Sequence, residues 1–166
     1  MTDEYEEYEY PFLRDLPDSM TLGEVRQLLR DNMYDGIKCP ACTQFVRIYN
    51  RKLNSGMARS LIRIYIKAGL DWFDLPRVCR GSSREEGKLR YWRLLEMGEE
   101  RGLWRLTTKG ELFVLGRIKV PSHAEIYDDR LLKLGGDPIN IHEALGSKFD
   151  YDELMETPGT KKPPPI

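Results

Sequence analysis

The chain has 166 residues, of which 40% are hydrophobic, and its 26 Lys or Arg nearly balance its 27 Asp or Glu. This length supports one main core with an extension rather than two large domains, and no apolar run approaches the length of a membrane crossing. The N-terminus is acidic where a secretory signal would be basic and then apolar, so we expect a soluble cytoplasmic protein. Its three cysteines are too few for a disulfide framework.

Charge is distributed unevenly along the chain. Residues 1–20 carry one Arg against seven acids, whereas residues 37–69 carry seven Lys or Arg and no acid. Residues 70–117 add ten basic and eight acidic residues, and the remainder of the chain is net acidic. A basic middle is the footprint expected of nucleic-acid contact, although Lys and Arg also solvate ordinary helix faces.

The two ends of the chain are expected to lack a fold. Residues 1–20 mix acids with tyrosines at no helical or strand period, which predicts a disordered acidic arm. Residues 157–166 hold four prolines beside two lysines and are expected to form an extended tail.

Residues 21–54 are predicted to form a helix followed by a hairpin. Thr21 and Glu24 have the spacing of a capping box, and the apolar stripe runs to about Met33. Residues 37–49 then predict a short hairpin with the Cys39–Cys42 segment at its turn. Its buried side chains are expected to be Phe45, Ile48 and Tyr49.

Residues 55–117 predict three helices, a hairpin and a closing helix. Asn54 or Ser55 caps the first helix and Gly69 ends it, and a short helix with Pro76 in its first turn follows over 74–79. A third helix is predicted over 83–95, with Ser83 and Glu86 as a capping box. The segment 96–102 suits a tight turn between strands, and Thr108 can cap the closing helix.

Residues 118–156 predict an appendage that packs against this hairpin. Two strands, 120–127 and 130–134, flank the turn signal Asp128-Asp129. A connection through Gly135–Pro138 leads to a short helix near 142–145.

The order of helix, hairpin and closing helix, with Arg105-Leu106-Thr107-x-Lys109-Gly110 on the second strand, resembles the winged helix of DNA-binding domains. Over a longer span the chain resembles a group of proteins encoded by tailed bacteriophages and prophages. That second resemblance rests on Cys39-Pro40-Ala41-Cys42, on residues 51–59, on Trp104–Thr107, and on Ala144–Gly146 with Phe149–Tyr151. This resemblance implies a fold more than an activity. It also implies that the protein is located in the cytoplasm of a host bacterium.

The fold class expected is α+β, with a winged helix-turn-helix core, the N-terminal helix and hairpin, and the C-terminal β-hairpin appendage.

A winged helix places its third helix in the major groove and its wing along the phosphate backbone. The resemblance therefore implies DNA contacts from basic side chains on the helices and the wing. The candidates are Arg59, Arg63, Arg84, Lys88, Arg90, Arg93, Arg101, Arg105 and Lys109.

Cys39 and Cys42 have the spacing of a zinc knuckle, in which two thiolates occupy two corners of a tetrahedron. The other ligands would come from Cys79, His123 or His142, or from the same knuckle of a second copy in a homodimer. Alternatively, the pair is a remnant whose structural role lies in the proline-containing turn. A redox role is less favoured, because the motif does not open a helix here.

Catalysis is not predicted, since the chain has two histidines and no phosphate-binding glycine loop. The sequence favours a non-enzymatic protein that binds duplex DNA, with transcriptional regulation as its most natural use. The alternative is an interaction module that docks on a host or phage replication or transcription protein.

Overall fold

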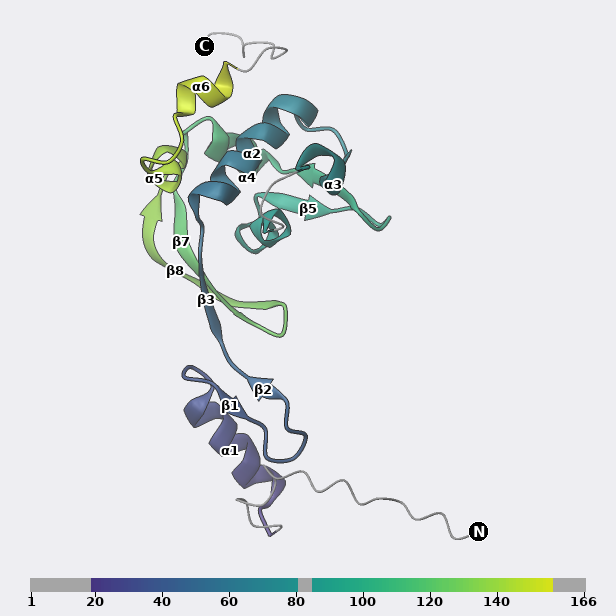
Figure 1. The fold of residues 1–166 in the computed structure, drawn as a ribbon, viewed down its shortest axis with the longest axis vertical. Helices are drawn as coiled ribbons and strands as arrows, with labels where there is room; N and C mark the ends of the chain where they lie inside the picture. Colours follow the sequence, from purple (N-terminus) through teal and green to yellow (C-terminus); the bar gives the residue numbers. More distant parts are fainter. Residues whose placement is uncertain (1–18, 81–84, 157–166) are drawn as a thin grey trace. The chain divides into compact units, whose positions relative to one another are not determined.

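The computed structural model of the chain describes residues 19–80 and 85–156 (Figure 1). Within these ranges the fold is α+β, with seven helices and three small antiparallel sheets. The chain divides into two compact units, residues 1–49 and 50–166. Nearly all of the predicted acidic arm (1–20), the predicted tail (157–166) and the predicted cap Ser83 lie outside the described residues.

The first unit contains helix α1 (Leu22–Asn32) and strands β1 (Ile37–Lys38) and β2 (Phe45–Val46). The predicted capping box is confirmed: Thr21 Oγ1 accepts from the Glu24 N–H at 3.3 Å, and the Glu24 carboxylate accepts from the Thr21 N–H at 2.7 Å. Antiparallel pairing of Ile37 with Val46 forms the predicted hairpin.

Burial in this hairpin differs from the prediction at two positions. Ile48 is buried as expected, but Phe45 is 52% exposed and Tyr49 is 43% exposed. Successive strand residues point to opposite faces, and here Val46 occupies the inner face. The Phe45 ring instead lies against Gly36, where an added Cβ would come within 2.4 Å of it.

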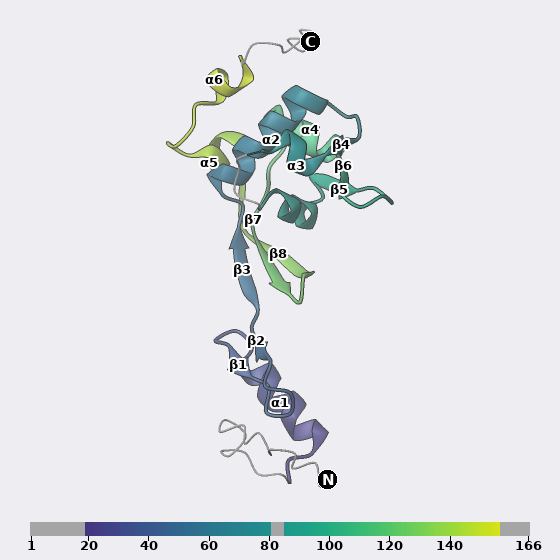
Figure 2. The ribbon, with the colours of Figure 1, turned by 45° about the vertical axis from the view of Figure 1, so that its right-hand side comes forward.

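The second unit consists of one long helix, two three-stranded sheets and several short helices (Figures 1 and 2). The sheets have the strand orders β3-β7-β8 and β4-β6-β5. In chain order the elements are β3 (Tyr49–Lys52), α2 (Ser55–Ala68), β4 (Phe73–Asp74), α3 (Leu75–Val78), the 3₁₀-helix η2 (Glu86–Trp92), β5 (Leu95–Met97), β6 (Leu103–Leu106), α4 (Thr108–Val114), β7 (Val120–Tyr127), β8 (Arg130–Ile139), α5 (Ile141–Leu145) and α6 (Tyr151–Met155).

Helix α2 is the element on which this unit packs. Asn54 caps it by accepting from the Met57 N–H at 3.0 Å, and Gly69, at φ +59°, ends it as predicted. Its inner face contacts α3, η2, α4, α5 and α6. The side chains buried along it are Met57, Ala58, Ser60, Leu61, Ile62 and Ile64.

The predicted winged-helix and appendage segments share this core. The appendage packs mainly on η2 and α2, not on the hairpin β5–β6 as the sequence predicted. The Trp92 indole N–H donates to the Pro121 carbonyl at 2.6 Å, and the Tyr151 hydroxyl donates to the Val114 carbonyl at 2.9 Å. Strand β8 also continues through Gly135–Pro138, the predicted connection, because Pro138 pairs with Pro121 and Ile139 with Val120.

Among the helices of residues 19–80 and 85–156, none combines the length and the apolar character that a bilayer crossing requires.

Helix α4 lies unusually close to the chain that precedes β5. Its cap is Thr107, one residue before the predicted Thr108, and Thr107 Oγ1 accepts from the Gly110 N–H at 3.0 Å. A Cβ on Gly110 would lie 2.2 Å from the Leu94 carbonyl oxygen, which is backbone and cannot swing aside. Only glycine fits this contact.

We therefore expect Gly110→Ala to lower the free energy of unfolding by about 1–3 kcal/mol, because α4 must move off Leu94. The matched control is Gly87→Ala. There the added Cβ would lie 3.5 Å from the Trp104 side chain, which is an ordinary van der Waals contact. That change should shift stability by less than about 1 kcal/mol. Urea unfolding measures both, and equal effects would contradict the close packing of α4.

Candidate nucleic-acid interface

The sheet β4-β6-β5 organises the segment for which the sequence predicted DNA contacts. Strand β6 pairs antiparallel with both neighbours, so Trp104 lies between Phe73 of β4 and Met97 of β5. Trp104 and Leu106 point into the core, while Arg105 lies on the opposite face. We call β5, β6 and the turn between them the wing hairpin. Glu96 and Met97, predicted to lie in its turn, belong to β5.

Helix α3 lies beside the turn of the wing hairpin. Its cap Asp74 accepts from the Arg77 N–H at 2.9 Å, and the Leu75 N–H donates to the Gly102 carbonyl at 3.3 Å. The short helix predicted over 74–79 is therefore present, and its first turn is held against the wing hairpin.

The third helix differs most from the prediction. In place of an α-helix over 83–95, the described residues contain the 3₁₀-helix Glu86–Trp92, which ends at Arg93 in the left-handed conformation with φ +58°. The apolar spacing of three residues that suggested an α-helix is also the 3₁₀ repeat. Glu86 is buried and accepts from Ser60 Oγ at 3.0 Å, while Ser83, its predicted capping partner, lies outside the described residues.

Burial limits what η2 can offer to a ligand. Four of its seven residues are buried, and the other three are only half-buried. The buried residues are Glu86, Leu89, Tyr91 and Trp92. This helix is therefore a core element with a narrow accessible edge.

Several predicted contact residues have partners within the chain. Lys88 pairs with Glu85 at 2.9 Å, Arg90 pairs with Asp129 at 2.5 Å, and Lys109 Nζ donates to the Trp92 carbonyl at 3.0 Å. The Arg59 guanidinium lies 4.9 Å from the centre of the Phe149 ring.

Arg105 is held by two neighbours on the outer face of the wing hairpin. Its Nε donates to Glu96 Oε1 at 2.7 Å, and its guanidinium lies 4.5 Å from the centre of the Trp72 ring. Neither partner was predicted from the sequence. The signal for Glu96 is cross-strand pairing, since Glu96 lies directly opposite Arg105 in the sheet.

Arg93 and Arg101 are exposed, as a contact role requires, while Arg63 is half-buried and Arg84 lies outside the described residues. Two further cations that the sequence analysis did not name, Arg77 and Arg80, are also exposed. Both follow the start of α3, beside the wing turn that carries Arg101.

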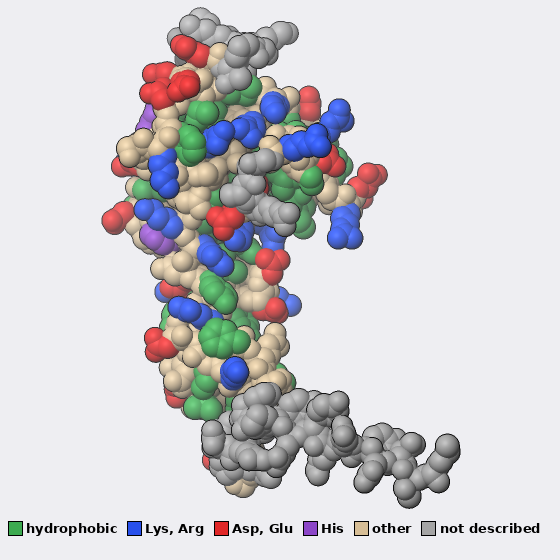
Figure 3. All heavy atoms as spheres, in the orientation of Figure 1, with side chains coloured by type: hydrophobic (Ala, Val, Ile, Leu, Met, Phe, Trp, Pro, Cys, Tyr) green, Lys and Arg blue, Asp and Glu red, His purple; other side chains and the backbone are tan. Residues whose placement is uncertain are grey.

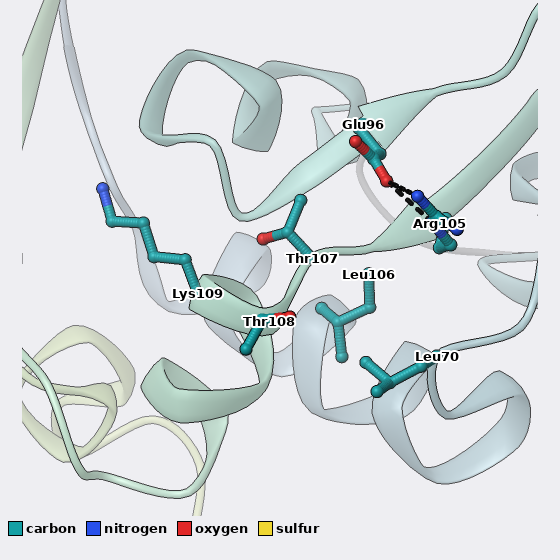
Figure 4. Close-up of a pocket in the computed structure, with 7 residues that line it drawn as sticks. All are labelled: Leu70, Glu96, Arg105, Leu106, Thr107, Thr108 and Lys109. Carbon is teal, nitrogen blue, oxygen red and sulfur yellow. Dashed lines mark hydrogen bonds and ion pairs between the residues drawn. The ribbon is translucent and has the colours of Figure 1, made fainter.

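Two open hollows bring some of the predicted residues together. In the first, Arg105 and Lys109 lie on opposite sides of Thr107 and Thr108, with Leu70 and Leu106 beside them (Figure 4). Arg90, Arg93 and Lys109 line the second, together with the exposed side chains of Met97 and Leu131. Both hollows are therefore lined by cations and by apolar groups.

The Asp129 carboxylate connects the appendage to η2. The Tyr91 hydroxyl donates to Asp129 Oδ1 at 2.5 Å, and the Arg90 guanidinium donates to Oδ2. The Tyr91 hydroxyl, followed by the charge of Arg90, lowers the pKa of Asp129, while burial and then this hydrogen bond raise the pKa of Tyr91. The ionised form of Asp129 is thus the one that the fold stabilises.

Within residues 19–80 and 85–156, no group of three or more His, Cys, Asp or Glu side chains could hold a metal ion. Cys79 is buried in the core of the second unit, His123 Nδ1 lies 2.8 Å from Ser122 Oγ, and the His142 ring lies 4.4 Å from the Tyr151 ring. These three side chains, considered as partners for Cys39 and Cys42, thus have contacts of their own within the second unit.

Comparison of the chain with protein-family models, with curated proteins and with solved structures finds no match.

We expect Asp129→Asn to lower stability at neutral pH, because Arg90 loses its ionised partner. Asn retains the tolerance for the left-handed conformation that Asp129 adopts at φ +58°. A lowered folded-state pKa stabilises the fold above the unfolded value of about 4, and this stabilisation disappears as the pH falls through the folded pKa.

Urea unfolding between neutral and acidic pH measures this effect. The curves of the wild type and Asp129→Asn should therefore converge in acid, whereas Asp128→Asn, at the neighbouring turn position, should follow the wild type. A pH-independent difference for Asp129→Asn would show that the carboxylate charge is not what stabilises the contact.

Proposed function

We propose that residues 55–117 form a winged helix and that the chain is a non-enzymatic protein that binds duplex DNA. The observation that carries this proposal is the order α2, β4, α3, η2, β5, β6, α4 combined with the strand order β4-β6-β5. In a winged helix, the strand between the first two helices joins the wing hairpin as the third strand of the sheet, and β4 does so here.

Charge supports nucleic acid as the ligand. Residues 50–117 contain 15 Lys or Arg against 8 Asp or Glu. On the face drawn in Figure 3, basic side chains gather over α2 and α3. Arg77 and Arg80 at α3 and Arg101 in the adjacent wing turn supply exposed cations along one edge of the sheet.

The burial of η2 favours contact with phosphates over base readout. A helix that reads bases must present several side chains to the major groove, whereas every residue of η2 is buried or half-buried. We therefore propose that the α3 edge and the wing hairpin contact the backbone, which gives affinity with little sequence preference.

The second candidate is a winged helix that docks on a host or phage protein. The observation in its favour is the set of large apolar side chains that remain exposed near the wing hairpin, namely Leu70, Trp72 and Met97. Such a contact would depend on apolar burial, so salt would change its affinity little.

The test is titration of a mixed-sequence duplex at several salt concentrations, with a second, unrelated duplex for comparison. We expect binding that weakens steeply with salt and differs little between the two sequences, since each phosphate contact contributes about 0.9 to the logarithmic salt slope. Absent or salt-insensitive binding would contradict this function and would favour the protein-docking alternative.

We expect Arg93→Ala and Arg101→Ala each to reduce the salt slope by about 1 without a large loss of stability, because both side chains are exposed. Replacing Glu99 and Glu100, exposed in the same wing turn, with Gln should instead raise the affinity.

The control is Lys148→Ala, an exposed cation in the segment between α5 and α6. Helices α5 and α6 lie away from β5 in Figures 1 and 2. Equal losses for Lys148→Ala and Arg101→Ala would mean that binding is diffuse and that the wing hairpin is not its site.

A further inference from the structure

The Cys39–Cys42 turn is closed by its own backbone. The Cys39 N–H donates to the Gln44 carbonyl at 2.8 Å, and the Thr43 N–H donates to the Cys39 carbonyl at 2.8 Å. Thr43 adopts φ +63°, the left-handed region that β-branched residues rarely enter. Residues at functional sites often hold such strain, because the surrounding structure stabilises the geometry as a whole.

The turn places backbone N–H donors and the Cys42 side chain beside the Cys39 sulfur. The backbone N–H of Cys42 and then that of Ala41 donate to the Cys39 sulfur, and the Cys42 side chain also interacts with it. The Cys39 sulfur therefore lies among the hydrogen-bond donors of its own turn. Cys42 is exposed and Cys39 is half-buried, so a ligand has access to both.

This pair supplies two of the four corners that a tetrahedral thiolate site needs. The described residues contain no group of three ligands, and Cys79, the third cysteine of the chain, is buried in the core of the second unit. A second copy of the same turn supplies two identical thiolates, and twofold symmetry makes the two halves equivalent.

The described part of the first unit, residues 19–49, buries few apolar side chains. Between residues 19 and 49 the buried apolar side chains are Val25, Val46 and Ile48. Four large apolar side chains in the same segment are exposed, namely Leu22, Tyr34, Phe45 and Tyr49. Scaffolds below about 70–80 residues usually depend on a metal ion, a disulfide or oligomerisation for stability.

We propose that Cys39 and Cys42 of two copies of this chain bind one Zn²⁺ ion between them and so join two protomers through their first units. Four thiolates in tetrahedral geometry select zinc over hard cations such as Mg²⁺ and Ca²⁺. Binding releases the protons of the thiols. The turn belongs to a segment, residues 37–69, with seven Lys or Arg and no acid, which favours the charge of −2 on a zinc tetrathiolate.

The experiment measures zinc content and molar mass of the full chain, purified under reducing conditions. We expect about 0.5 zinc per chain and a dimer that a chelator converts to monomer, with added Zn²⁺ restoring it. Replacement with Co²⁺ should give the absorption of a tetrahedral site with four thiolate ligands.

Cys39→Ser with Cys42→Ser should abolish both zinc binding and the dimer, whereas Cys79→Ser should retain both. The DNA titration of the double variant separates this proposal from the proposed function, because the second unit does not contain the site. A zinc-free chain, a monomer with one zinc per chain, a cobalt spectrum with two thiolates, or a dimer that survives the double substitution would each overturn the proposal. An iron–sulfur chromophore in place of zinc would overturn it as well.

Discussion

Burial of Trp92 is the constraint on which the second unit depends. The side chain is fully buried, its indole N–H is satisfied by the Pro121 carbonyl at 2.6 Å, and its own carbonyl accepts from Lys109 Nζ at 3.0 Å. One residue thereby connects η2 to β7 and to α4. An aromatic side chain with a polar N–H can be buried this deeply only if the N–H finds an acceptor, which fixes the position of β7. Arg93 then turns into the left-handed conformation, so that Leu94 and Leu95 enter the core and β5 can begin.

The same constraint shapes the proposed DNA contact. Since η2 contributes four residues to the core, its two cations pair within the chain, Lys88 with Glu85 and Arg90 with Asp129 of the appendage. Exposed cations are present instead at α3, at Arg93 and in the wing turn. A protein with this distribution is suited to holding DNA by its backbone, because contacts with phosphates need cations at the right spacing but no exposed helix. Exposed Leu70, Trp72 and Met97 lie near the same hairpin, so apolar contacts with a partner protein would use the same surface.

The first unit presents the opposite situation. Its described residues, 19–49, bury few side chains, yet the turn at Cys39–Cys42 is closely defined by backbone hydrogen bonds and by the strained Thr43. A small hydrophobic core and a well-ordered pair of thiols are complementary features, since metal binding contributes free energy to folding that apolar burial here does not supply. If two copies share a zinc ion, the second units are presented in pairs, which suits a ligand with the repeating charge of duplex DNA.

The sequence by itself determined the features that depend on residues a few positions apart. The Thr21 and Glu24 capping box, the Asn54 cap, the end of α2 at Gly69 and the Asp128-Asp129 turn all follow from such local hydrogen bonding and backbone preference. Tertiary structure alone decided the helix type of η2, the continuation of β8 through Gly135–Pro138 and the partners of Glu86 and Arg90. Ser60 and Glu86 are 26 residues apart, and Arg90 and Asp129 are 39 residues apart. Contacts over such separations form only when the core brings distant segments together, so no pattern of neighbouring residues predicts them.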